Sequence, residues 1–166
     1  MTSEGTPKMN RYVAVGFTVG ILAGVWTWLS SEFNLITWIA FVTWALFFAV
    51  GGKAAAVVKI APPFVTGILY GTIVILLATI LHSAWVVPVG VGVIAFIMCA
   101  QANRKVLAII PGAFVGAAVL FGTGGNWLGA GIAGLVGLGL GFLSEWSAGL
   151  LTKPRSKATK PSSATA

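Results

Sequence analysis

The stretch AFVTWALFFAVGG, residues 40–52, contains no charged side chain and ends in two glycines. It returns as AFVGAAVLFGTGG at residues 113–125, where seven of the thirteen positions are identical, and Ala40 thereby corresponds to Ala113. We interpret the two copies as the trace of an internal duplication. The alternative is that two glycine-ended apolar helices resemble each other through composition alone.

Further apolar runs lie on both sides of each copy. Of the 166 residues, 58% are hydrophobic and only 8% are charged, whereas a soluble domain carries about a quarter charged residues. A helix needs about 20 apolar residues to cross a hydrocarbon core of about 30 Å. The runs predict an all-α membrane protein with transmembrane helices at residues 12–30, 35–52, 64–81, 85–102, 106–123 and 127–151.

The rest of the chain forms two short tails in this interpretation. Residues 1–11 are expected to be a cytoplasmic N-terminal tail and residues 12–151 the membrane domain, with halves at about 12–81 and 85–151. Residues 152–166 are rich in Lys, Ser, Thr, Ala and Pro, a composition that cannot bury apolar surface. We therefore expect a disordered cytoplasmic C-terminal tail.

The basic residues predict the orientation. In a six-span arrangement they all fall on one side of the membrane: Lys8, Arg11, Lys53, Lys59, Arg104, Lys105, Lys153, Arg155, Lys157 and Lys160. Short basic loops stay in the cytoplasm, so both termini are predicted to be cytoplasmic. With three spans in each half, the two halves would run in opposite directions, as a 3+3 inverted repeat.

The inventory of reactive side chains argues against an enzyme. The acidic residues are Glu4, Glu32 and Glu145, and the chain has one histidine, one cysteine and no aspartate. A Ser-His-Asp triad lacks its acid, and a metal site needs three or four converging ligands. We expect no catalysis, no metal and no cofactor. The net charge of +7 does not indicate nucleic-acid binding, because no soluble domain fits beside six spans.

Glycines recur at helical spacing in several spans. Such small residues let membrane helices approach closely, within a protomer or between protomers, and we expect a homo-oligomer. The alternative is that the backbone carbonyl groups left accessible at these glycines line a path for a solute. The glycines proposed for helix packing are Gly16, Gly20, Gly24, Gly137 and Gly141.

A path for a solute would need polar or aromatic side chains inside the membrane. Trp44 is the preferred constriction, because an indole N–H needs a partner at depth. The alternative is that aromatic residues pack and that threonines bond to their own helix. The proposed path residues are Thr43, Trp44, Phe48, Gln101, Pro111, Gly112, Phe114 and Phe121.

Two further features allow opposite interpretations. Pro111 either breaks the fifth span and frees polar backbone or marks the first turn of that helix, and Pro62-Pro63 are expected to precede the third span in a similar way. Glu145 is the only acid in an apolar run. It either couples transport to an ion, or it snorkels to the cytoplasmic surface or pairs with a nearby lysine.

Several segments resemble one family of bacterial membrane proteins. GILAGVWTWLS (20–30), GVIAFIMCAQA (92–102), IPGAFVGA (110–117) and FGTGGNW (121–127) are similar to the YcdZ-like inner-membrane family. The resemblance extends over most of the chain and all six spans. It implies a multi-pass protein of the bacterial inner membrane, of unknown activity, and it transfers no catalytic residue.

Three hypotheses follow for function. The first is a passive channel or facilitator for a small neutral or weakly anionic solute, since the chain lacks the buried carboxylates that couple transport to ions. The second is a non-transporting scaffold or accessory subunit in the bilayer. The third is a small secondary transporter coupled through Glu145.

Overall fold

The computed structural model describes residues 10–152, and every regular element within them is helical. The all-α prediction is confirmed for these residues, while most of both predicted tails lies outside them. In chain order the elements are α1 (Arg11–Glu32), α2 (Thr37–Ala49), α3 (Lys53–Leu81), α4 (Val86–Ala100), the 3-10 turns η1 (Gln101–Asn103) and η2 (Lys105–Leu107), α5 (Ile110–Gly122) and α6 (Trp127–Thr152).

The six helices are of unequal length. Four are long and apolar enough to cross a membrane, namely α1, α3, α6 and α4 when it is extended through η1. The apolar helices α2 and α5 have 13 residues each, which is about 20 Å at 1.5 Å per residue. The 29 residues of α3 reach about 43 Å, which is longer than a hydrocarbon core of about 30 Å, so a membrane-spanning α3 would tilt or extend beyond the core. How many helices cross the membrane stays a prediction.

The third helix begins at Lys53 rather than at residue 64, so Pro62 and Pro63 lie inside it. A proline leaves the carbonyl four residues earlier without its helical donor. Those carbonyls belong to Val58 and Lys59, which are both exposed, so other donors can reach them. The expectation that these prolines precede the helix was therefore wrong.

The fifth helix begins at Ile110 and carries Pro111 in its first turn. A proline there costs no hydrogen bond, because the first N–H groups of a helix have no helical partner. The preceding segment forms η2 rather than the start of a span at residue 106. The structure agrees with the interpretation of Pro111 as a helix start and not with a broken span.

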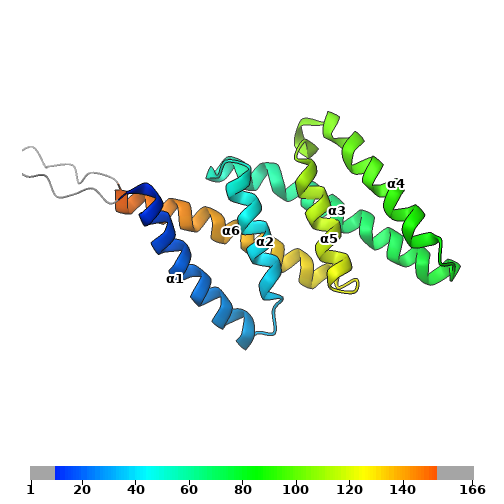
Figure 1. Ribbon diagram of the computed structural model, residues 1–166, viewed down its shortest axis with the longest axis horizontal. Coiled ribbons are helices and arrows are strands. Elements are labelled where there is room, and N and C mark those ends of the chain that lie inside the picture. Colours follow the sequence, from blue (N-terminus) through cyan, green and yellow to red (C-terminus); the bar gives the residue numbers. More distant parts are fainter. Residues whose placement is uncertain (1–9, 153–166) are drawn as a thin grey trace, which may run out of the picture.

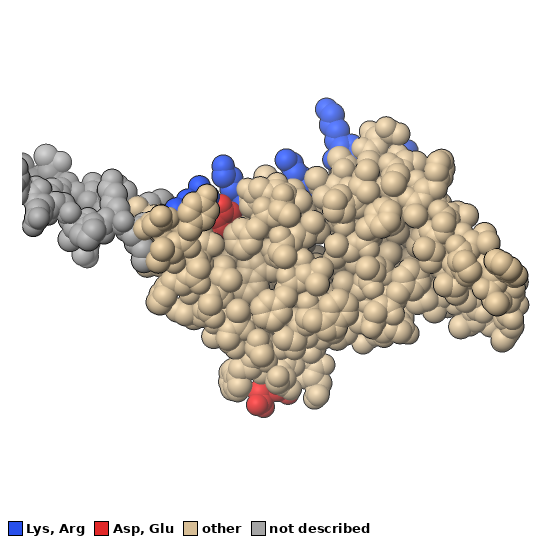
Figure 2. Space-filling model, in the orientation of Figure 1, with Lys and Arg blue, Asp and Glu red and all other residues tan. Residues whose placement is uncertain are grey.

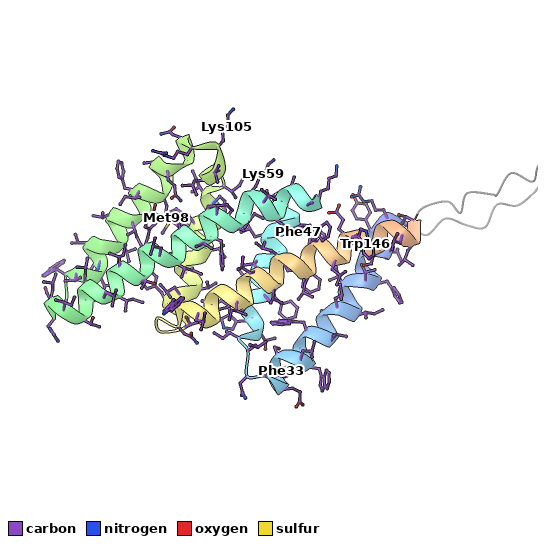
Figure 3. The ribbon with its side chains drawn as sticks, turned by 180° about the vertical axis from the view of Figure 1, so that it is seen from behind. Phe33, Phe47, Lys59, Met98, Lys105 and Trp146 are labelled. Atoms are coloured by element: carbon purple, nitrogen blue, oxygen red, sulfur yellow. The ribbon has the colours of Figure 1, made fainter. Side chains whose placement is uncertain are left out.

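The short helices α2 and α5 cross the long helices α6 and α3 at glycines (Figures 1 and 3). Gly137 of α6 faces the carbonyl oxygen of Ala40, and Gly67 of α3 faces the carbonyl oxygen of Ala113. A Cβ at either glycine would lie under 3.0 Å from that oxygen. Only glycine therefore permits both crossings.

The buried positions of α2 and α5 match one for one in the alignment that pairs Ala40 with Ala113. They are Ile39, Ala40, Thr43, Trp44, Leu46 and Phe47 in α2, and Gly112, Ala113, Gly116, Ala117, Val119 and Leu120 in α5. The long helices show a similar match. In an alignment of α3 with α6 that sets Phe64 against Gly134, all but one of the buried positions of α6 correspond to a buried position of α3. The long helices meet at this pair, where the ring of Phe64 lies on Gly134.

Both short helices end in a glycine pair with left-handed backbone. Gly51 and Gly52 have φ of 102° and 68°, and Gly124 and Gly125 have φ of 64° and 95°. Glycine adopts such angles without the penalty that a Cβ imposes. The two copies of the repeated stretch therefore end in the same kind of turn.

The basic side chains of residues 10–152 gather along one edge of the molecule (Figure 2). Lys59 and Lys105 lie at this edge, which we call the basic face, and Phe33 lies at the opposite one (Figure 3). The side chains concerned are those of Arg11, Lys53, Lys59, Arg104 and Lys105.

Candidate functional site

Ser144 of α6 joins three helices through hydrogen bonds. The indole Nε1 of Trp44 donates to its Oγ at 3.2 Å, and the hydroxyl of Thr18 donates to its carbonyl oxygen at 2.9 Å. Trp44 is 3% exposed, and the ring of Phe41 stacks on it with centroids 6.1 Å apart. The indole N–H thus has its partner at depth, inside the contact between α1, α2 and α6.

Thr43, another proposed path residue, is fully buried. Its Oγ1 lies 2.8 Å from the carbonyl oxygen of Gly134 on α6, and it also approaches two carbonyl oxygens of its own helix. A hydroxyl has one proton, and carbonyl groups already accept it. Thr43 therefore joins α2 to α6.

The other proposed path residues are spread over the molecule. Phe114 and Phe121 line a small hollow between α4 and α5, and Phe48 lines a different one at the basic face. Gly112 packs against Pro63. In residues 10–152 the eight proposed path residues do not line one common cavity.

The proposed packing glycines fall into two groups. Gly137 and Gly141 receive α2, the latter against the ring of Phe47. Gly16, Gly20 and Gly24 are not buried, and a Cβ added to any of them would meet nothing within 4 Å. The glycines of α1 therefore contact no other helix in the described part of this chain.

Glu145 connects α6 to two other helices at the basic face. Its Oε1 pairs with the guanidinium of Arg11 at 3.1 Å, and its Oε2 accepts a hydrogen bond from the backbone N–H of Lys53 at 2.5 Å. Lys53 is the first residue of α3, where N–H groups lack helical partners and a negative charge is favourable. Among the described residues Glu145 pairs with Arg11, and the lysines that follow α6 lie outside these residues.

A hollow of about 380 Å³ opens beside this ion pair, lined by Arg11, Glu145 and Phe48 among others. Gly52 forms part of its wall, and a Cβ there would lie 2.5 Å from Glu145 Oε2. Both oxygens of the carboxylate already have partners. The arrangement fixes the start of α3 against α1 and α6.

Gln101 forms a polar cluster where α4 ends. Its Oε1 accepts hydrogen bonds from the hydroxyl of Tyr70 at 3.0 Å and of Thr66 at 3.3 Å, both on α3. Its Nε2 is buried and has no hydrogen-bond partner in the part of the chain that the structure describes. A buried donor without a partner costs about 1–3 kcal/mol, so this amide has an unmet bond.

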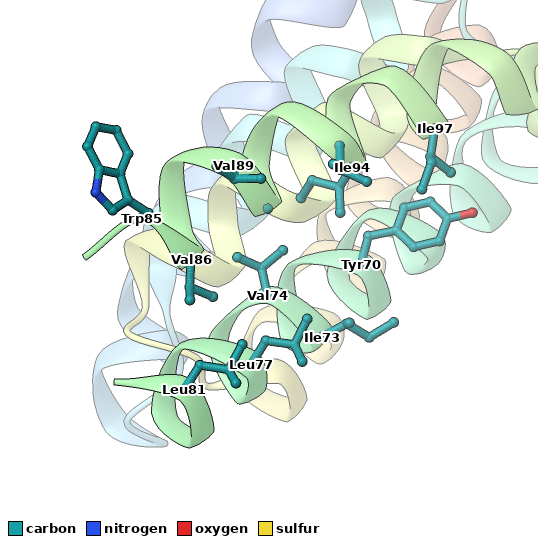
Figure 4. Close-up of a pocket in the computed structure, with 12 residues that line it drawn as sticks. Tyr70, Ile73, Val74, Leu77, Leu81, Trp85, Val86, Val89, Ile94 and Ile97 are labelled. Atoms are coloured by element: carbon teal, nitrogen blue, oxygen red, sulfur yellow. The ribbon is translucent and has the colours of Figure 1, made fainter. Parts of the chain in front are cut away.

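An apolar groove of about 600 Å³ runs between α3 and α4 (Figure 4). Trp85 and Leu81 lie at one end, and Tyr70 and Ile97 lie at the other. Tyr70 thus belongs both to the groove and to the Gln101 cluster. We call this cavity the α3–α4 groove.

Sequence reasoning did not single out Ser144 or Tyr70. Ser144 follows the glycines of α6 at helical spacing, three residues after Gly141, which places it on the face that receives α2. Tyr70 lies four residues after Thr66, on the same face of α3. These spacings mark the faces, but the partners lie on distant segments.

Comparison with known proteins identifies the family. The family described as "Protein of unknown function (DUF1097)" matches residues 17–149. The chain belongs to this family. No solved structure matches the chain significantly.

Two of the curated relatives are named as inner membrane proteins. The chain is 30% identical to inner membrane protein YcdZ of Escherichia coli over 122 residues, which cover 72% of this chain and 74% of the relative. It is 31% identical to YcdZ of Salmonella typhimurium over 122 residues, 72% of this chain and 76% of the relative. The uncharacterized protein YahC of Escherichia coli is 28% identical over 161 residues, 90% and 98% of the two chains. The YcdZ-like resemblance is confirmed.

Proposed function

We propose that the protein is a six-span inner-membrane protein whose two halves are related by an inverted repeat. The support is a contact that recurs between the halves. Ala40 of α2 lies on Gly137 of α6, and the corresponding Ala113 of α5 lies on Gly67 of α3. A second pair of contacts follows the same spacing, since Gly141 faces Phe47 where Gly71 faces Leu120. A duplication accounts for the shared contact partners of α2 and α5, whereas chance similarity between two helices does not.

The proposed orientation has both termini in the cytoplasm. Five basic residues of the described chain lie on the basic face, and cytoplasmic loops carry such an excess of Lys and Arg. In this orientation α2 runs toward the cytoplasm and α5 away from it. The two repeated stretches would then cross the bilayer in opposite directions.

Within this architecture we propose passive conduction of a small neutral or weakly anionic solute. The observation that carries the proposal is the paired crossing of α2 on α6 and α5 on α3, because inverted repeats of membrane helices typically enclose a substrate path at their interface. Glu145, the acid considered for ion coupling, is occupied by Arg11 and by the N-terminus of α3. Passive movement needs no coupling acid.

The centre of the repeat interface is closed by Phe64, which is fully buried on Gly134. A conducting protein would open there, so Phe64→Ala is expected to raise the flux. Phe17→Ala provides the matched control, because Phe17 is exposed on α1. Both variants are checked for monodisperse folding before reconstitution, and Phe64→Leu serves as a milder change.

The experiment measures solute entry into proteoliposomes by light scattering, with glycerol, urea and acetate. Flux above that of empty liposomes, raised by Phe64→Ala and unchanged by Phe17→Ala, supports conduction. Flux equal to that of empty liposomes for every solute and variant rejects it. The closed centre then favours the second candidate function, a non-transporting scaffold or accessory subunit.

The homo-oligomer also stays a proposal. Gly16, Gly20 and Gly24 lie on a face of α1 that no other described helix covers, where small residues would permit close approach of a second copy. Mass measurement of the protein in lipid nanodiscs distinguishes one copy from several. A single copy at all protein-to-lipid ratios would reject the proposal.

A further inference from the structure

We propose that the α3–α4 groove binds the hydrocarbon chain of a long-chain fatty acid, whose carboxyl group meets Gln101. This inference goes beyond conduction and does not depend on it. It rests on the shape of the groove, on the polar cluster at one end of it, and on the unmet hydrogen bond of Gln101.

The groove is suited to an apolar chain. All of its lining residues are apolar except Tyr70 and Trp85, which carry one polar atom each on large rings. From Leu81 to Tyr70 the groove follows α3 for about 17 Å at 1.5 Å per residue. Its volume of about 600 Å³ falls within the range of small-molecule sites, roughly 300–1,000 Å³.

The helix α4, which forms one wall of the groove, is held by apolar packing alone. In residues 86–100 no side chain of α4 donates or accepts a hydrogen bond with another helix, whereas α1 is joined to its neighbours through Thr18, Trp26 and Ser30. Close contact between α3 and α4 is reached at Gly90, where a Cβ would lie 3.0 Å from Val74. Ile94 and Met98 of α4 also pack in one cluster with Val74 of α3, and the groove lies beside these contacts.

The polar cluster around Gln101 lies in line with the faces of α3 and α4 that form the groove. Gln101 follows the groove residue Ile97 by four positions, and Thr66 precedes Tyr70 by four. Residues four apart lie above one another on a helix, so the apolar lining passes into the cluster at the end nearer the basic face. A chain lying in the groove would bring its head group to this end.

The chemistry of the head group follows from Gln101. Oε1 already accepts hydrogen bonds from Tyr70 and Thr66, and Nε2 is the donor without a partner among the described residues. A turn of the carboxamide toward the groove would let Nε2 donate to a carboxyl oxygen of the ligand. Arg104 and Lys105, three and four residues further along and both exposed, favour an acidic head group at this face.

The test uses photolabelling of the full chain in nanodiscs of dioleoylphosphatidylcholine. The probe is a 16-carbon fatty acid with a diazirine near the end of its chain, and adducts are mapped by mass spectrometry. We expect adducts at groove residues such as Leu77 and Val89, displaced by palmitic acid. Adducts spread equally over the lipid-exposed Phe17 and Leu128 would overturn the proposal, and this arm needs no variant.

Substitutions test separately how the hydrocarbon chain and the head group of the fatty acid bind. Val93→Trp fills the groove and should reduce labelling about tenfold, whereas Val87→Trp, also on α4 but outside the groove, should leave it unchanged, since lost apolar contact is what weakens binding. Gln101→Leu should weaken displacement by palmitic acid about fivefold to tenfold, as expected for one hydrogen bond.

Competitors separate the fatty acid from other occupants. Hexadecane has the same hydrocarbon chain without a carboxyl group. In the wild-type protein it should compete with the probe about tenfold less well than palmitic acid does. Equal competition by hexadecane, or equal labelling of the two tryptophan variants, would overturn the proposal. Equal displacement by dipalmitoylphosphatidylglycerol would identify the occupant as an ordinary two-chain bilayer lipid and would also overturn it.

Discussion

Gly67 of α3 faces the backbone carbonyl of Ala113 on α5 so closely that any Cβ at this position would lie under 3.0 Å from the oxygen. The atom in the way belongs to backbone, which cannot move without displacing a whole helix. We expect Gly67→Ala to destabilise the protein by about 2 kcal/mol or more, in the upper range for overpacking. Thermal unfolding in detergent measures the change.

A matched control is available in α6. Gly139 is also a mid-helix glycine, but a Cβ there meets nothing within 4 Å. Gly139→Ala should be neutral or should stabilise by up to about 1 kcal/mol, because alanine favours helix. Equal effects of Gly67→Ala and Gly139→Ala would show that the α3–α5 crossing is not as close as in this structure.

Trp44 tests the difference between a constriction and a packing residue. Trp44→Phe removes the hydrogen bond to Ser144 Oγ and should cost about 1 kcal/mol, seen as a lower unfolding temperature. Because the ring lies inside the α1–α2–α6 contact, solute flux in liposomes should not change. Trp28→Phe on the exposed side of α1 is the control and should alter neither quantity. An increase of flux in Trp44→Phe alone would support Trp44 as a constriction.

Glu145 should act through structure rather than through ion coupling. Glu145→Gln keeps an oxygen for the N–H of Lys53 and loses the pair with Arg11, whose side chain is 73% exposed. An exposed pair contributes about 0–1 kcal/mol. Glu145→Ala also removes the acceptor at the start of α3, a loss of about 1 kcal/mol more.

The unfolding temperature should therefore fall from the wild type to Glu145→Gln and fall further in Glu145→Ala. Salt screens the pair between Glu145 and Arg11, so it should reduce the difference in unfolding temperature between the wild type and Glu145→Gln. Glu32→Gln, which changes an exposed acid at the end of α1, is the control. Uptake against a gradient in the wild type that disappears in Glu145→Gln would contradict this assignment and support a coupled transporter.

The helix-on-helix faces could be predicted from the sequence to a large extent. The duplicated stretch marks α2 and α5, whose buried positions agree in the same alignment that the repeated letters define. The glycines of α6 mark the face that receives α2. Such faces are local, because helical spacing of small residues decides where backbones can meet.

What the sequence could not predict depends on residues far apart in the chain. Phe64 was expected to start a span after two prolines, yet it lies within α3 at the crossing with Gly134. The pair between Glu145 and Arg11 joins residues separated by 134 positions. The α3–α4 groove has no signal in the sequence, because its lining has the same composition as any surface that faces lipid.

Cysteine labelling tests the orientation on which the inverted arrangement depends. The single cysteine, Cys99, is first replaced by alanine, and one cysteine is then introduced at Lys59, Lys105, Phe33 or His82. Lys59 and Lys105 lie at the basic face and Phe33 at the opposite edge (Figure 3), and His82 ends α3 away from its basic start. A membrane-impermeant maleimide added to intact cells should label positions 33 and 82 but reach positions 59 and 105 only after lysis, since basic loops stay in the cytoplasm. Labelling of position 105 in intact cells, with position 59 protected, would mean that the second half runs in the same direction as the first, and the inverted repeat would be excluded.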